Sequence, residues 1–188
     1  MTERSARFRE LHADGIFLMP NPWDVGSAKL LASMGFKALA TTSAGLAWSL
    51  GKLDMQVARD ELVAHVERLA AATPLPLNVD SERCFPDESG GVEETVRLLA
   101  DAGAAGCSIE DFDPATGAIE PLEVAAERVA AAAEAAPLVL TARAENHLHG
   151  IDDLDDTIAR LAAYRDAGAD VVYAPGLRDL AAIGRVVV

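Results

Sequence analysis

The sequence predicts an α/β fold, in which helices alternate with the strands of a parallel sheet that curls as a (β/α)8 barrel. First, Ala-rich stretches of helical periodicity end at a small residue plus Gly, and a short apolar run follows. These joints lie at Gly35, Gly103 and Gly168, 68 and 65 residues apart, or two units of about 33 residues each. Second, the strand-like runs are continuously apolar, as in parallel strands buried on both faces. The 188 residues suggest a single domain, 1–188.

Six strand–helix units can be counted. The expected strands are 16–20, 37–42, 75–80, 106–111, 138–143 and 170–174, and the expected helices are 25–34, 54–72, 90–102, 122–136, 153–167 and 177–187. A barrel usually needs about 250 residues, so we expect a barrel truncated to about six units, with a gap between its first and sixth strands. Both bare edges would be apolar, which predicts poor solubility or association through the gap.

An open doubly wound sheet is the competing architecture. Such a sheet usually has a Gly-rich phosphate loop after its first strand, whereas residues 19–24 read Met-Pro-Asn-Pro-Trp-Asp. A barrel of the TIM type instead predicts polar residues at the carboxyl ends of several strands. Five expected strands end this way, with Asn21, Asp24, Thr41, Thr42, Ser43, Asn78, Asp80, Glu110, Asp111, Arg143, Glu145 and Asn146. The barrel is therefore favoured.

The composition excludes several classes of function. Sixteen Lys and Arg against thirty Asp and Glu give a net charge of −14, which disfavours nucleic acid and anionic membrane surfaces as partners. No window approaches the ~18 apolar residues of a membrane span, and residues 1–15 lack the apolar core of a signal peptide. Two cysteines, Cys84 and Cys107, cannot build a disulfide scaffold, so we expect a cytoplasmic protein.

Three acids are expected to meet at the carboxyl end of the sheet. Asp80, Glu110 and Asp111 would converge there from neighbouring strands. Carboxylates at such spacing repel one another unless a hard cation lies between them, and Mg²⁺ suits because it needs only one or two carboxylates besides water and substrate oxygens. The alternative is that these acids cap helices or pair with Arg83.

Arg143 follows an apolar run in the expected fifth strand. A guanidinium at a barrel mouth is suited to bidentate binding of a carboxylate, although a pair with Glu145 or Glu110 that only holds the loops is the alternative. Residues 42–45 read Thr-Ser-Ala-Gly, a polar loop whose N–H groups can bind a carboxylate or enolate oxygen unless it is an ordinary turn. Trp23 would either line a pocket or merely pack.

Several segments, taken together, resemble the isocitrate lyase/phosphoenolpyruvate mutase superfamily. They are residues 21–24 with 27–28, 35–38 followed by 42–43, 78–80, 106–111, 141–145 and 164–170. The resemblance covers essentially the whole chain. It implies a (β/α)8 barrel whose C-terminal helix swaps between subunits, hence a homo-oligomer. It also implies Mg²⁺-dependent making or breaking of C–C or P–C bonds next to an α-oxycarboxylate.

The resemblance implies roles for individual residues as well. The residues expected to serve catalysis are Asp54, Arg143 and Glu145; those expected to bind a small carboxylate substrate are Trp23, Asp24, Ser43, Ala44 and Arg143; those expected to serve Mg²⁺ are Asn78, Asp80 and Glu110. Asp80 and Glu110 would act on the metal through water, and Asp54 would be an acid behind them. Amides near Ser43 would share the developing charge of an enolate.

The chain departs from the pattern of the superfamily at three places. Residues 78–80 read Asn-Val-Asp where many members have Asp-x-Asp. Residues 112–119 contain neither the Lys-Lys-Cys-Gly-His run of isocitrate lyases nor the Lys of the mutases, and residues 173–176, Tyr-Ala-Pro-Gly, lack the Glu of the lyases and the His of the mutases. Isocitrate is therefore not the expected substrate.

We expect a Mg²⁺-dependent lyase that cleaves a C–C bond in a small 2-hydroxy or 2-oxo acid through an enolate. One alternative is P–C bond chemistry, as a mutase or hydrolase, on a phosphonopyruvate-like substrate. The other is a non-catalytic or truncated member of the superfamily that binds small dicarboxylates or only forms subunit contacts.

Overall fold

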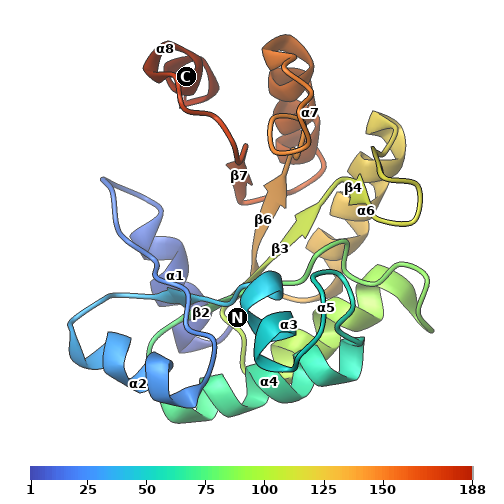
Figure 1. Cartoon of the computed structure of the whole chain (residues 1–188). Helices are drawn as coiled ribbons and strands as arrows, with labels where there is room; N and C mark the ends of the chain where they lie inside the picture. The colour runs from blue at the N-terminus through green and yellow to red at the C-terminus, as the bar shows by residue number, and fades with distance from the viewer. Residues whose placement is uncertain (188) are drawn as a thin grey trace.

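A computed structural model describes residues 1–187. It contains five parallel strands in the order β1-β2-β3-β6-β7, which form a curved sheet (Figure 1). Their bounds are Leu39–Ala40 for β1, Leu77–Asp80 for β2, Gly106–Glu110 for β3, Val139–Arg143 for β6 and Val171–Tyr173 for β7. The predicted α/β arc is thus confirmed, with β1 and β7 at its edges. The expected association through the gap stays a prediction.

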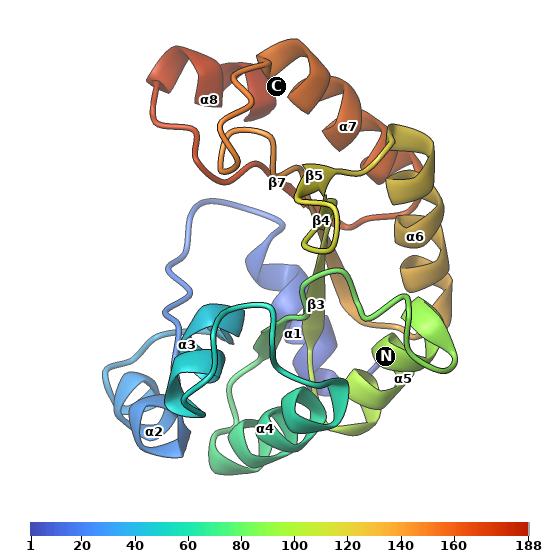
Figure 2. The ribbon, with the colours of Figure 1, turned by 45° about the vertical axis from the view of Figure 1, so that its right-hand side comes forward.

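The helices that follow the strands cover the convex side of the arc. Figure 2 shows α4, α5, α6 and α7 in a curved row outside the strands. The helices are α1 (Glu3–Leu11), α2 (Val25–Ser33), α3 (Ser43–Ser49), α4 (Arg59–Ala72), α5 (Gly91–Asp101), α6 (Leu122–Ala135), α7 (Leu154–Asp166) and α8 (Leu180–Val187). None of the helices within residues 1–187 combines the length and apolar character needed to cross a bilayer.

Alternation along each strand separates core residues from site residues. Successive side chains of a strand point to opposite faces. On β3, Cys107 and Ile109 belong to the large buried core under the helices, so Ser108 and Glu110 face the concave side. In the strand register, Glu110 is paired with Arg143 and Arg143 with Tyr173. The carboxyl ends of the strands, called the mouth below, therefore hold a row of polar side chains.

Helix α1, which the sequence analysis did not predict, closes the other end of the arc. Its Phe8 is fully buried and packs with Ala38, Ala105 and Val139, all at or just before strand starts. Arg9 of α1 also forms an ion pair with Asp170. The helix was missed because its sequence is mostly charged, with Phe8 as the only buried apolar residue.

The predicted strand at 16–20 is wrong within the described chain, since this segment is irregular. One backbone hydrogen bond joins it to β1, from the Ala40 N–H to the Pro20 carbonyl. Ile16 is 98% exposed and Leu18 is 72% exposed. Proline has no N–H to donate to a sheet, and the apolar run is largely solvent-exposed. The arc therefore has five strands rather than six.

The predicted helix at 54–72 begins later, at Arg59. Met55 has a positive φ of 63°, which a right-handed helix does not contain. The helix start is set by Glu61, whose carboxylate accepts the Ala58 N–H at 2.8 Å and also binds Lys52. Two further elements were not predicted, namely α3 and an antiparallel hairpin of β4 (Phe112–Asp113) and β5 (Ala118–Ile119).

Candidate functional site at the mouth of the arc

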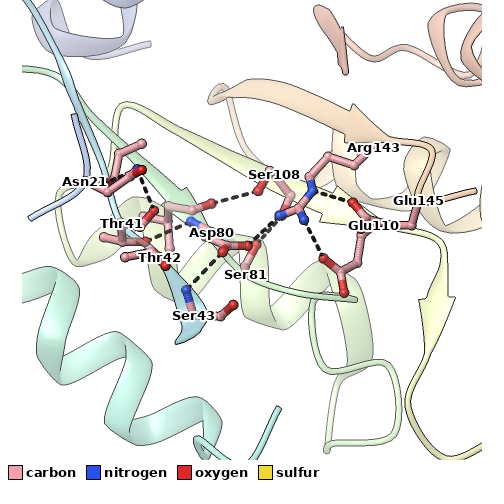
Figure 3. A network of polar contacts seen from close by, with 12 residues as sticks. Asn21, Thr41, Thr42, Ser43, Asp80, Ser81, Ser108, Glu110, Arg143 and Glu145 are labelled. Atoms are coloured by element: carbon pink, nitrogen blue, oxygen red, sulfur yellow. Dashed lines mark hydrogen bonds and ion pairs between the residues drawn. The ribbon is translucent and has the colours of Figure 1, made fainter. Parts of the chain in front are cut away.

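Arg143 lies at the centre of the mouth, among three carboxylates that come from three strand ends (Figure 3). Its Nη1 donates to Asp80 at 2.9 Å, its Nε donates to Glu145 at 2.8 Å, and its Nη2 lies 3.2 Å from Glu110. We call these four residues the mouth cluster. Asp80 ends β2, Glu110 ends β3 and Arg143 ends β6, so the parallel register brings them together.

The start of α3 holds Asp80 in place. The Ser43 N–H, in the first turn of α3, donates to Asp80 Oδ2 at 2.9 Å. The Asp80 N–H in turn donates to the Thr41 hydroxyl at 2.8 Å (Figure 3). Residues 42–45 are thus the capped beginning of a helix, with Thr42 as its N-cap, rather than the expected loop. The Ser43 N–H already donates to Asp80. The next amide in the first turn, that of Ala44, is therefore available to a ligand.

The electrostatics of the mouth show an excess of negative charge. Burial raises the pKa of Glu110 to about 8, and the charges of Glu145 and Asp80 add to this against the opposing effect of Arg143. Burial also raises the pKa of Glu145. Burial would lower the pKa of Arg143, but Asp80, Glu110 and Glu145 raise it, so the guanidinium stays charged. One permanent cation therefore serves three acids.

Glu82 is a further acid at the mouth, and the sequence analysis missed it. Burial, together with the charges of Asp80 and Asp54, raises its pKa to about 7. Its backbone has a positive φ of 52° and its carbonyl accepts the Glu110 N–H at 3.0 Å. A non-glycine residue in this conformation is uncommon and is often found at functional sites. The spacing Asp80-Ser81-Glu82 was the available sequence signal, an acid pair two residues apart after an apolar strand.

Asn78, expected beside the metal, lies deeper in the arc. It is paired with Gly106 at the start of β3, and its Oδ1 lies 2.9 Å from where a Cβ on Gly106 would be. Phe8 of α1 is equally close to that point, so Asn78 is near the closed end and not in the mouth cluster. The resemblance aligns residues 78–80 with a pair of acids two positions apart in many members of the superfamily. At the mouth of this chain, such a pair is instead formed by Asp80 and Glu82.

Trp23 and Asp24 have structural contacts. Asp24 caps α2: its side chain accepts the Ser27 N–H at 2.7 Å, and its own N–H donates to the Ser27 hydroxyl oxygen. Trp23 packs edge-on against Trp48, with ring centroids 5.8 Å apart. A Cβ on Gly45 would lie 2.6 Å from Trp23 Nε1, so the indole rests directly on α3.

The two other residues expected to serve catalysis differ in exposure. Asp54 is exposed in the loop before α4, where its charge acts on Glu82. Glu145 is 1% exposed, and its carboxylate binds Arg143. Glu145 therefore holds the guanidinium from behind rather than facing the opening.

The donor set of the mouth fits a hard divalent cation that keeps much of its water. Asp80, Glu82 and Glu110 offer carboxylate oxygens, which Mg²⁺ prefers. Burial, together with the charges of neighbouring acids, raises the pKa of Glu82 and of Glu110, and a bound cation would favour their charged forms. Within residues 1–187, no group of three or more His, Cys, Asp or Glu side chains is arranged to hold a metal unaided. Mg²⁺ bound by one or two carboxylates plus substrate oxygens and water satisfies both observations.

The fold and site together define a class: a barrel-type α/β protein with an acidic, arginine-centred mouth. The model of the phosphoenolpyruvate phosphomutase family matches residues 8–188, and the chain belongs to this family. The 2-methylisocitrate lyase of Salmonella typhimurium (strain LT2) is 31% identical over 165 residues, which are 81% of this chain and 55% of that protein. The chain spans 54% to 66% of the length of the curated relatives that it matches.

Solved structures agree with this membership. A provisionally named lyase/mutase from Burkholderia cenocepacia J2315 is 53% identical with a TM-score of 0.92, over 97% of this chain and 68% of that one. Oxaloacetate acetylhydrolase in complex with its product oxalate is 27% identical with a TM-score of 0.87, over 97% and 67%. A phosphonopyruvate hydrolase complex with oxalate and Mg²⁺, 22% identical, shares the fold with a TM-score of 0.90 over 99% and 68%.

Proposed function

We propose that this chain carries the substrate-binding mouth of a Mg²⁺-dependent lyase that cleaves a C–C bond in a small 2-hydroxy or 2-oxo dicarboxylic acid. The observation that carries the proposal is the composition of the mouth cluster, in which one partly buried guanidinium faces three carboxylates. Such a site is suited to a ligand that brings a carboxylate for Arg143 together with a divalent cation for the acids. A 2-hydroxy or 2-oxo acid provides the oxygens for both.

Arg143 has the donors needed for this role. A guanidinium carries five N–H groups, and the contacts to Asp80, Glu110 and Glu145 use three of them. Two N–H groups, one on each terminal nitrogen, remain for a substrate carboxylate. Because Glu145 and Asp80 hold the guanidinium on two sides, its orientation is set before the substrate arrives, which lowers the entropic cost of binding.

Asp80 and Glu110, with Glu82 beside them, are the residues that would hold Mg²⁺. When bound, the ion would polarise the α-oxygen and one carboxylate oxygen of the substrate and so stabilise an enolate leaving group. Asp80 is held by the Ser43 N–H and by Arg143, so it presents its carboxylate in a fixed direction. The amide of Ala44, one residue further into α3, can add a hydrogen bond to the developing negative charge.

The charge of the mouth favours C–C over P–C chemistry, whereas the relatives of this chain include enzymes of both kinds. A 2-methylisocitrate lyase and an oxaloacetate acetylhydrolase with bound oxalate are similar to this chain above 25% identity. So are a carboxyvinyl-carboxyphosphonate phosphorylmutase and a phosphoenolpyruvate phosphomutase, so identity alone does not choose between the two reactions. A phosphonate carries more negative charge than a carboxylate and needs more cationic partners. Arg143 is the only arginine or lysine of the mouth cluster, which suits the smaller charge of a carboxylate.

The test is turnover by the full chain with a panel of 2-hydroxy and 2-oxo dicarboxylic acids, with and without Mg²⁺. Products of retro-aldol cleavage that require Mg²⁺ support the proposal. Release of phosphate or phosphonate from a phosphonopyruvate-like acid would replace it with P–C chemistry. Binding without turnover of any acid would replace it with a non-catalytic role.

Asp80→Ala is the matching variant. It should abolish Mg²⁺-dependent turnover while the protein stays folded, because a strand-end acid supports little of the core. Asp101→Ala, which removes an exposed acid at the end of α5, is the control and should keep full turnover. Full activity of Asp80→Ala would remove Asp80 from the site.

A further inference from the structure

Asp111, the residue after β3, is turned away from the mouth and into a buried network. It is 1% exposed, and its Oδ2 accepts hydrogen bonds from the Tyr164 hydroxyl at 2.5 Å and from Arg160 Nη1 at 3.2 Å. Its Oδ1 accepts the Glu145 N–H at 2.9 Å. Asp111 therefore links helix α7, which carries Arg160 and Tyr164, to the segment that follows β6.

The hydrogen bond from Glu145 to Asp111 lies in the segment after β6, whose backbone must be extended for Glu145 to contact Arg143. Side chains two residues apart lie on the same face only while the backbone is extended, so Glu145 reaches back to Arg143 only on that condition. Strand β6 ends at Arg143. Beyond it, the Ala144 N–H bonds to the Tyr173 carbonyl at 3.0 Å, and the Glu145 N–H bonds to Asp111.

A turn begins immediately after this point. The Glu145 carbonyl accepts the His149 N–H at 3.1 Å, so residues 145–149 fold back on themselves. His149 also stacks on Phe112, the neighbour of Asp111, with ring centroids 3.5 Å apart and planes within 8°. Asp111 and Phe112 thus hold the loop from the β3 side at both of its ends. Without the bond from Asp111, the turn is free to start earlier and to carry the Glu145 carboxylate away from Arg143.

We propose that Asp111 and Tyr164 are positioning residues that set the orientation of the Arg143 guanidinium through Glu145. Tyr164 and Arg160 fix the carboxylate of Asp111, Asp111 fixes the backbone of Glu145, and the Glu145 carboxylate fixes Arg143 Nε. Within residues 1–187, the side chains of Asp111 and Tyr164 form no hydrogen bond or ion pair with Asp80, Glu110 or Arg143, so the polar link from them to Arg143 passes through Glu145. The relevance to substrate rests on the proposed function, because it takes Arg143 as the carboxylate-binding group.

The experiment compares Asp111→Asn with Asp113→Asn in the full chain. Both changes remove one carboxylate from the same segment, but Asp113 pairs with Arg83 and does not contact Glu145. The first measurement, made without ligand, is the rate at which the Arg143 Nε–H proton exchanges with water, followed by ¹H–¹⁵N NMR. The second is the affinity for oxalate in the presence of Mg²⁺. Melting temperature and circular dichroism establish that each variant is folded.

We expect Asp111→Asn to speed exchange of the Arg143 Nε–H about tenfold or more and to weaken oxalate binding by about 10- to 100-fold, as for other residues that orient a ligand-binding group. Asp113→Asn should leave both within about twofold of wild type. Asp111→Asn keeps one oxygen that can accept the Glu145 N–H, whereas Asp111→Ala keeps none. A folded Asp111→Ala protein with unchanged exchange at Arg143 overturns the proposal.

If the Asp111 variants do not fold, Tyr164→Phe tests the positioning role instead. It removes one hydroxyl and keeps every other partner of Asp111, so we expect a smaller increase in exchange, about threefold. No increase in folded Tyr164→Phe also overturns the proposal. If wild-type protein binds no oxalate, the proposed function fails, but the exchange measurement at Arg143 still tests the positioning role.

Discussion

Two ionic clusters, whose residues interleave along the sequence, differ in charge balance. In the mouth cluster, Arg143 is the only cation for Asp80, Glu110 and Glu145. In the cluster that holds the β4–β5 hairpin, called the hairpin cluster, Arg83 binds Asp113 at 2.8 Å and Glu120 at 2.6 Å, and Arg128 binds Glu120 as well. The hairpin cluster thus has two cations for Asp113 and Glu120, while a third acid, the exposed Asp87, lies 3.6 Å from Arg83 at its rim.

The pKa directions follow this balance. At the mouth, burial raises the pKa of Glu110 and Glu145 because too little positive charge offsets it. In the hairpin cluster, hydrogen bonds from the Ala115 N–H and Thr116, together with the charge of Arg83, lower the pKa of Asp113. Acids and cations in equal number stabilise each other in the folded protein. Acids in excess over cations favour the binding of a cation or a proton, which is typical of functional sites. The comparison therefore separates the binding site from the structural ion pairs.

Arg143→Ala gives the largest expected effect at the mouth. It leaves Asp80, Glu110 and Glu145 without a cation and removes the group that would grip a carboxylate. We expect the oxalate affinity to fall at least about 100-fold, measured by titration calorimetry with Mg²⁺. Arg143→Lys keeps the charge but not the planar fork, so its affinity should also fall sharply. Wild-type affinity in Arg143→Lys would reduce Arg143 to a general positive charge.

Glu120→Gln should lower stability and leave oxalate affinity nearly unchanged. It leaves Arg83 and Arg128 without their shared buried carboxylate, and we expect the free energy of unfolding to fall by about 3 kcal/mol. Urea unfolding at pH 7 measures this loss, while oxalate affinity should change less than twofold. If Glu120→Gln had normal stability and weak oxalate binding, the hairpin cluster would be part of the binding site and not a structural cluster.

The pH dependence of stability tests the charge imbalance directly. A carboxyl whose pKa is raised in the folded state holds its proton there longer than in the unfolded chain, so its contribution to stability is full below about pH 4.5 and is lost as pH rises through the folded value. For Glu82 and Glu110 this loss extends to about pH 7 and about pH 8.

Without divalent cations, we therefore expect wild-type protein to lose stability between pH 5 and pH 9. Glu110→Gln, which cannot ionise, should remove part of this slope, on the order of 2 kcal/mol across the range. Urea unfolding at several pH values measures both proteins. Equal slopes in the two would show that Glu110 is ionised with an ordinary pKa.

Asp24→Ala has the smallest expected effect and separates a cap from a substrate ligand. Asp24 accepts the Ser27 N–H at the start of α2, so its loss should cost about 1 kcal/mol of stability. Thermal unfolding measures that cost, and oxalate affinity should stay unchanged. Weaker oxalate binding at normal stability would restore the role that the sequence predicts for this residue.

The predictions that succeeded rest on local rules. Glycines after helix ends and continuous apolar runs located five strands and the helices between them, because helix capping and burial on both faces leave a pattern in short stretches of chain. The same rules placed Asp80, Glu110 and Arg143 at strand ends, and parallel strands bring their carboxyl ends together. The failures at residues 16–20 and 54–58 occurred where exposure and a left-handed residue, Met55, interrupt these patterns.

Local pattern could not decide how the polar residues divide into two networks. Asp111 is next to Glu110 in the chain, yet Glu110 faces Arg143 and Asp111 faces Tyr164, because neighbouring side chains at a strand end point to opposite sides. Asn78 was expected at the mouth and lies near Phe8, since α1 closes that end of the arc. Spacing along the chain therefore established the fold class and the acidic strand ends. That Asp80 and Glu110 share Arg143 with Glu145 depends on contacts between residues 63 and 33 positions apart, which exist only in the folded sheet.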